Sequence, residues 1–151
     1  MGAWGTGIFS NDLACDVRDE FRDLVAEGKT SEEATAALLA SYHTSLTEPP
    51  DDDDDTPVFW IALAIIQWKT GLLLDGVRDR AISIIDGGGD VERFESVADR
   101  RKREQVLSRV REQLVSPQRP PTKIRRWPKS ETDLQPGDVL AYQHPSGRWV
   151  A

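Results

Sequence analysis

The sequence predicts a mainly α-helical protein, an orthogonal bundle of about five helices followed by a C-terminal β-hairpin. Three observations support this prediction. Apolar residues recur at three- and four-residue spacing in successive segments, which is typical of amphipathic helices. Capping residues or glycines lie at the ends of these segments, where helices begin and stop. The apolar–polar alternation of a strand occurs only near the C-terminus.

The first two helices are marked by their ends. Ser10 and Asn11 are both favoured N-cap residue types before the first helical segment, and Gly28 has the usual position just after a helix. Thr30 and Glu33 then form the pattern of a capping box, in which a hydroxyl and a carboxylate cap each other's backbone. We expect the second helix to end near His43.

A linker rich in proline and aspartate precedes the third helix. Its five consecutive aspartates repel one another and cannot join a core, so we expect this segment to be exposed. Thr56 and Pro57 have the N-cap and N1 patterns. The following residues, 58–70, are apolar almost all round, which is typical of a helix surrounded by others. This helix is predicted to form the centre of the core and to stop at Gly71.

Two further helices are predicted after the central one. The fourth begins at Asp75 or Gly76 and is closed by three glycines, 87–89. The last helix covers about residues 97–115, and Pro117 prevents its continuation. The cations of the last helix are expected to project outward, namely Arg100, Arg101, Lys102, Arg103, Arg109 and Arg111.

The chain is predicted to divide into three parts. A helical domain covers residues 1–116, a proline-rich basic linker covers 117–136, and a β-hairpin segment covers 137–151. A lone hairpin is marginally stable. It therefore either packs on the helical body or begins a truncated small β-barrel, and we favour the second interpretation.

Composition and charge limit the function classes. No apolar run reaches the roughly 18 residues of a membrane span, and no signal-peptide pattern is present. Cys15 is the single cysteine, which agrees with a reducing, cytoplasmic environment. The net charge of −7 is uneven, with −11 in residues 1–60 and +4 in residues 61–151. The acidic half would attract a basic partner.

Residues suited to catalysis or metal binding are sparse. Cys15, His43 and His144 do not form a zinc or Cys–His pattern. The acidic run 51–55 lacks the spacing, central glycine and terminal glutamate of an EF-hand. We therefore expect no metal, no cofactor and no enzymatic activity. A hydrolase whose pocket uses residues interpreted here as packing remains an alternative.

The N-terminus carries a resemblance to a known family. The chain begins Met1-Gly-Ala-Trp-Gly-Thr-Gly-Ile-Phe-Ser-Asn-Asp12. Glycines that permit tight folding alternate with large apolar anchors, so the segment should dock on the protein. It resembles a bacterial family of small proteins that open Met-Gly-x-Trp-Gly-x-Gly-x-Phe-x-Asn-Asp and form a domain of unknown function. The resemblance implies a bacterial origin and a shared fold. Because the family has no established activity, the resemblance does not indicate one.

These observations favour an interaction protein of immunity or antitoxin type, whose acidic surface binds a basic partner protein. The residues proposed for this surface are Asp16, Asp19, Asp23, Asp51, Asp52, Asp53, Asp54 and Asp55. The main alternative is a nucleic-acid-associated accessory protein that uses the basic region 100–129. Its candidate residues are Arg101, Arg103, Arg125, Arg126 and Trp127.

Overall fold

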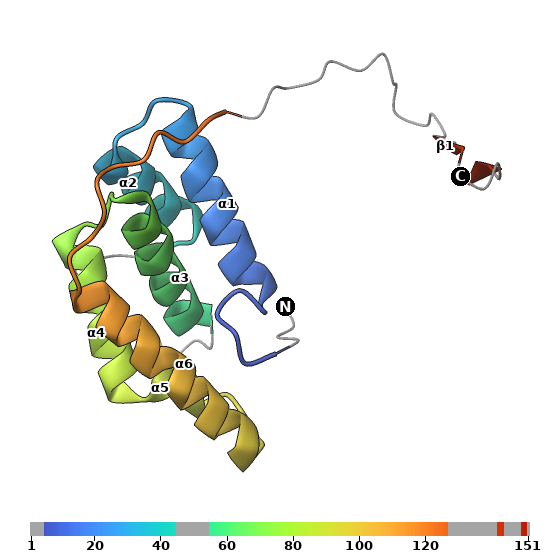
Figure 1. The fold of residues 1–151 in the computed structure, drawn as a ribbon, viewed down its shortest axis with the longest axis vertical. Coiled ribbons are helices and arrows are strands. Elements are labelled where there is room, and N and C mark those ends of the chain that lie inside the picture. Colours follow the sequence, from blue (N-terminus) through green and yellow to red (C-terminus); the bar gives the residue numbers. More distant parts are fainter. Residues whose placement is uncertain (1–4, 45–54, 127–141, 144–148, 151) are drawn as a thin grey trace.

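The computed structural model describes residues 5–44, 55–126, 142–143 and 149–150. This part of the chain is mainly helical, as predicted, with six helices and one two-stranded sheet (Figure 1). In chain order the elements are α1 (Asp12–Ala26), α2 (Ser31–Ser41), α3 (Asp55–Thr70), α4 (Asp75–Gly87), α5 (Gly89–Glu92), α6 (Val97–Val115), β1 (Tyr142–Gln143) and β2 (Trp149–Val150).

The predicted caps of α1 and α2 are present. The Asn11 side chain accepts a hydrogen bond of 3.2 Å from the backbone N–H of Ala14. At α2 the capping box is complete, because Thr30 Oγ1 accepts from the Glu33 N–H and Glu33 Oε2 accepts from the Thr30 N–H. These bonds satisfy donors that have no partner within a helix. The first two helices are therefore fixed by local sequence.

Helix α3 is the centre of the core, as its composition predicts. Every residue from Val58 to Gln67 is buried, so the helix is covered on all sides. Figure 1 shows α3 between α1 on one side and α4 on the other, and α6 also contacts it. The inner faces of α1, α2, α4 and α6 supply its cover with buried residues that include Phe21, Leu38, Val77 and Leu114.

One polar side chain lies inside this apolar centre. Gln67 is fully buried on α3. Its Nε2 donates to Thr35 Oγ1 on α2 at 2.7 Å, and its Oε1 accepts from the Leu74 backbone N–H at 3.1 Å. Both ends of the amide are thus satisfied, which a buried polar group requires. Gln67 ties α2 and the α3–α4 turn to the central helix.

The C-terminal end of α3 is covered by a segment from the far end of the chain. Residues 117–126, here called the C-terminal strap, run past this end of α3 toward α1 (Figure 1). The Thr122 N–H donates to the Thr70 carbonyl at 2.8 Å, and Gln118 Oε1 accepts from the Leu73 N–H at 3.0 Å. The basic linker was expected to be extended, and its described part is extended and docked.

Gly71 makes this close approach possible. Its φ of 74° lies in the left-handed region, and a Cβ at this position would lie 2.5 Å from the Arg119 carbonyl oxygen. Glycine alone accommodates both the backbone conformation and the neighbouring chain. The predicted helix stop at Gly71 is confirmed, and the structure adds a second reason for this glycine.

Three details differ from the sequence predictions. Helix α3 begins at Asp55, before the predicted N-cap Thr56. A short helix, α5, follows the left-handed Gly88 (φ 75°), where only a connecting segment was expected. Arg103 was expected to project outward, and this is wrong: it is only 3% exposed. Its partner is a buried carboxylate on α5, a long-range contact that helical spacing does not reveal.

Two short antiparallel strands, β1 and β2, are the described part of the predicted β-hairpin, and its remaining residues, 137–141, 144–148 and 151, lie outside the described part of the chain. Tyr142 lies opposite Val150, and Gln143 lies opposite Trp149. The residues that connect this pair to the strap, 127–141, lie outside the described part of the chain. Packing of the hairpin on the helical body, or its continuation into a barrel, therefore stays a prediction, as does the division into three parts.

Replacing Trp60 by Ala should lower the free energy of unfolding by about 3–5 kcal/mol, as large aromatic truncations in cores do. Trp60 is fully buried and packs edge-on against Phe59, with ring centroids 5.3 Å apart. Its Nε1–H has no hydrogen-bond partner among the described residues. Trp60→Phe removes this group and keeps most of the apolar volume, so it should cost clearly less. Urea denaturation measures both; equal losses would contradict the volume argument.

Substitution of Gly71 by Ala should destabilise more than the same change at Gly28. Gly28 also has a positive φ, 101°, but no atom lies within 4 Å of its Cβ position. Gly28→Ala therefore carries only the left-handed backbone cost of about 1–2 kcal/mol. Gly71→Ala adds a clash with the strap, which we expect to cost at least about 1 kcal/mol more. Denaturation measures the difference, and faster tryptic cleavage after Lys123 would report strap release.

Candidate functional site

The outer surface of α1 carries a row of carboxylates. Asp16, Glu20, Asp23 and Glu27 are all exposed, and their spacing of four, three and four residues places them on one face of the helix. A groove of about 330 Å³ lies between this face and α2. Its lining residues, which define the acidic groove, are Glu20, Asp23, Leu24, Glu27, Ala37, Leu38 and Ser41.

Two contacts position carboxylates along this groove. The Tyr42 hydroxyl donates to Glu20 Oε1 at 3.0 Å. Burial, reinforced by this bond, raises the pKa of Tyr42 well above its ordinary value. Glu27 lies 3.6 Å from the Arg126 guanidinium of the strap. A basic side chain of the protein itself thus already approaches the acidic groove.

An adjacent side of α1 borders a second, larger depression of about 610 Å³. It lies between α1, the end of α3, the N-terminal segment and the strap. Its lining residues, which define the cationic cleft, are Phe9, Arg18, Asp19, Arg22, Asp23, Ile66, Lys69, Ile124 and Arg125. Apolar side chains from three segments meet there beneath a mainly basic border. Asp23 lines both depressions.

Both members of an ion pair on α1, Arg18 and Asp19, line the cationic cleft. Arg18 donates to both oxygens of Asp19, at 2.7 and 2.9 Å. This bond lowers the pKa of the Asp19 carboxyl below its ordinary value, against the opposing effect of partial burial. Asp19 is therefore already paired within the cationic cleft.

The predicted partner-binding residues do not form one surface. Asp23 lines the acidic groove, Asp16 lies near it on the same helix face, and Asp19 belongs to the cationic cleft. Asp55 begins α3, and residues 51–54 lie outside the described part. Sequence reasoning missed Glu20 and Glu27. Their helical spacing from Asp16 and Asp23 was the signal that could have identified them.

The residues of the nucleic-acid alternative are likewise separated. Arg101 is exposed near the start of α6, whereas Arg125 and Arg126 lie on the strap beside α1. Figure 1 shows these two regions at opposite ends of the helical body. Arg103 is buried and unavailable to a ligand, and Trp127 lies outside the described residues.

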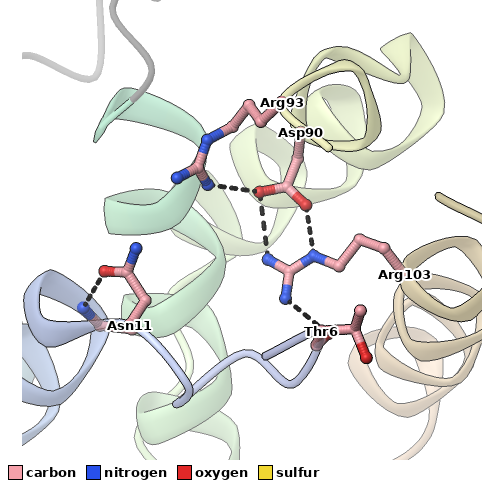
Figure 2. Close-up of polar contacts among 6 residues, drawn as sticks. Thr6, Asn11, Asp90, Arg93 and Arg103 are labelled. Atoms are coloured by element: carbon pink, nitrogen blue, oxygen red, sulfur yellow. Dashed lines mark hydrogen bonds and ion pairs between the residues drawn. The ribbon is translucent and has the colours of Figure 1, made fainter. Parts of the chain in front are cut away.

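A buried charged cluster fixes the segment that supplies Phe9 to the cleft (Figure 2). Asp90 is fully buried on α5 and accepts from Arg103 at 2.5 and 3.1 Å and from Arg93 at 3.3 Å. Arg103 also donates to the Thr6 carbonyl at 3.1 Å. These bonds join α5, α6 and the N-terminal segment. Two guanidiniums share the single carboxylate of Asp90, and the cluster has the properties of a structural anchor.

The remaining chemically reactive side chains are dispersed. His43 is exposed at the end of α2 with a φ of 51°, and the half-buried Cys15 thiol donates to the Phe9 carbonyl at 3.4 Å. Among the described residues, no three His, Cys, Asp or Glu side chains are grouped as metal ligands would be. No helix in this part of the chain has the length and apolar character needed to span a membrane.

The buried cluster predicts a specific pattern of stability. Asp90→Ala leaves Arg103 buried without its carboxylate, so it should cost about 3–5 kcal/mol of unfolding free energy. Replacing both partners, Asp90→Leu with Arg103→Met, removes the Arg103 charge and should restore part of that loss, although Arg93 still loses its contact with Asp90. Urea denaturation of Asp90→Leu, Arg103→Met and the double variant measures the coupling. Additive losses would show that the two side chains do not stabilise each other.

Comparison with known proteins identifies one family model that matches part of the chain. Residues 2–75 match a family model described as "Domain of unknown function (DUF4259)". The matched range includes the N-terminal segment and α1 to α3, and it ends at the first residue of α4. No curated protein and no solved structure matches the chain. Over this range the chain is therefore similar to a family of uncharacterised domains.

Proposed function

We propose that this protein is a non-enzymatic interaction protein of immunity or antitoxin type, whose acidic groove binds a basic segment of a partner protein. The observation that carries the proposal is the composition of the groove. Three carboxylates, from Glu20, Asp23 and Glu27, border a floor that includes Leu24 and Leu38. A site of this composition favours ligands that combine a positive charge with an apolar stem.

Lysine and arginine side chains have this combination. Their methylene stems pack on apolar surface while the charged end remains near water or a carboxylate. A groove of about 330 Å³ is large enough for one or two such side chains and too small for a folded element. The acidic groove would therefore bind individual basic side chains projecting from a partner's surface, as a central anchor within a larger interface.

The strap provides an internal example of this recognition. Arg126 lies 3.6 Å from Glu27, and both side chains are largely exposed. An exposed pair of this kind contributes little stability, about 0–1 kcal/mol, so a partner's guanidinium could replace it at small cost. The net charge of −7 adds long-range attraction for a basic protein, which acts mainly on the association rate.

The nucleic-acid alternative retains one supporting observation. The outer face of α6 presents exposed cations, including Arg101 and Arg109. Such a face could contact phosphates. The two proposals use different surfaces, so they can be separated by substitutions with the same change in charge.

The test compares two double charge reversals. Glu20→Lys with Glu27→Lys alters the acidic groove, and Glu104→Lys with Glu112→Lys makes the same change in charge on exposed positions of α6. Each protein is used to capture partners from host lysate, and the recovered protein is identified, purified and measured by stopped-flow. We expect a basic partner whose association rate falls about tenfold for the groove variant and far less for the α6 variant.

Salt dependence provides a second measurement on the same pair of molecules. Charge attraction between exposed groups is screened over about 8 Å at 0.15 M ionic strength. The association rate of the unmodified protein should therefore fall with salt, and the groove variant should lose most of this dependence. Recovery of nucleic acid instead, lost on Arg101→Glu with Arg109→Glu and retained in the groove variant, would overturn the proposal in favour of the alternative.

A further inference from the structure

We propose that the cationic cleft binds a small organic anion, a carboxylate or phosphate that carries an apolar group. This inference concerns the face of α1 next to the acidic groove and does not depend on the proposed function. The cleft volume of about 610 Å³ lies within the range of about 300–1,000 Å³ of small-molecule sites. Its lining combines the two features that such a ligand requires.

The first feature is an apolar floor assembled from distant parts of the chain. Phe9 comes from the N-terminal segment, Ile66 from α3 and Ile124 from the strap. Each segment is fixed independently. The Arg103–Thr6 hydrogen bond anchors the N-terminal segment, α3 is the core helix, and the Thr122–Thr70 bond holds the strap. The floor is therefore formed before any ligand binds, which lowers the entropic cost of binding.

The second feature is an excess of positive charge above this floor. Arg18 is paired with Asp19. In the described part of the chain, no salt bridge joins Arg22, Lys69 or Arg125 to a carboxylate. Arg22 acts on Asp19 at longer range, lowering the pKa of that carboxyl. An anion bound in the cleft would form ion pairs with these cations.

The Phe9 ring orients two of the cations. The Arg18 guanidinium lies 5.3 Å from the ring centroid, and the Lys69 ammonium lies 5.5 Å from it. Both distances are within the range of cation–π attraction. These contacts hold positive charge directly beside the apolar floor. A ligand whose anionic group meets Lys69 would therefore place its apolar part against Phe9, Ile66 and Ile124.

The charge distribution around the cleft selects small anions over polyanions. Asp19 and Asp23 border the cleft, and the acidic groove begins on the other side of Asp23. A nucleic-acid strand would place further phosphates beside these carboxylates and would be repelled. A single carboxylate or phosphate monoester interacts only with the local cations. The same cations would bind a carboxylate or a phosphate monoester, so separate probes are needed to distinguish the two ligand classes.

The test uses phenyl phosphate and 3-phenylpropionate as probes, with calorimetry and protein NMR shifts as measurements. Inorganic phosphate and benzyl alcohol serve as half-probes, since each has only one of the two required groups. We expect at least one full probe to bind with a dissociation constant at least tenfold lower than either half-probe. The probe that binds more tightly identifies the source as phosphate or carboxylate.

Matched variants locate the binding. Arg22→Gln with Lys69→Gln removes two cations from the cleft, and Arg109→Gln with Lys29→Gln removes two exposed cations elsewhere. The cleft variant should weaken the full probe at least tenfold, and the distant variant should leave it within twofold. Ile124→Ser should weaken the full probe while leaving inorganic phosphate unchanged. Circular dichroism verifies folding; all these positions lie outside the buried core.

Three outcomes would overturn the proposal. The first is that neither full probe binds with a dissociation constant below about 10 mM. The second is that inorganic phosphate binds as tightly as phenyl phosphate, and the third is that the distant variant weakens binding as much as the cleft variant. The last result would indicate attraction by overall charge. Probe binding by the Glu20→Lys, Glu27→Lys protein separates the two proposals, because neither glutamate lines the cationic cleft. Failure of one proposal therefore leaves the other intact.

Discussion

Burial of α3 on every side is the constraint from which the remaining structure follows. A helix whose residues 58–67 are all buried must be covered around its whole circumference, and no single neighbour can do this. Helices α1, α4, α5 and α6 each contact it, and the strap covers its C-terminal end. The buried Gln67 joins it to α2, and Gly71, directly after its last residue, allows the close approach of the strap. The fold is thus organised around one helix whose apolar surface is unfavourable in contact with water.

This arrangement also determines where charge can accumulate. The inner face of α1 is occupied by Leu13, Val17 and Phe21, so its many ionisable side chains are confined to the outer surface. They separate by sign around the helix, with carboxylates toward α2 and arginines toward the strap. The separation is not complete, because Asp19 is paired on the basic side. Two surfaces of different binding chemistry therefore lie on one helix.

The sequence predicted what depends on local interactions and on helical periodicity. The caps at Asn11 and Thr30 and the all-apolar third helix could be identified because a few neighbouring residues determine them. Arg103 was misplaced because its burial depends on Asp90, thirteen positions earlier and on a helix too short to show periodicity. The docked strap and both surface depressions were not predicted. They form where segments distant in sequence come together, so no local sequence pattern indicates them.

The two attachments of α6 have a further consequence for this helix. Only a narrow face of α6 is buried, through Leu107, Val110 and Leu114, and such a face by itself would allow the helix to slide. Arg103 fixes one end on Asp90, and the strap fixes the other end through Thr122. An insertion or deletion of a single residue within α6, between Arg103 and Val115, would rotate one end of the helix by about 100° relative to the other. The length of α6 and the choice of its buried face are therefore both constrained. The residues on the rest of its surface can be substituted more freely.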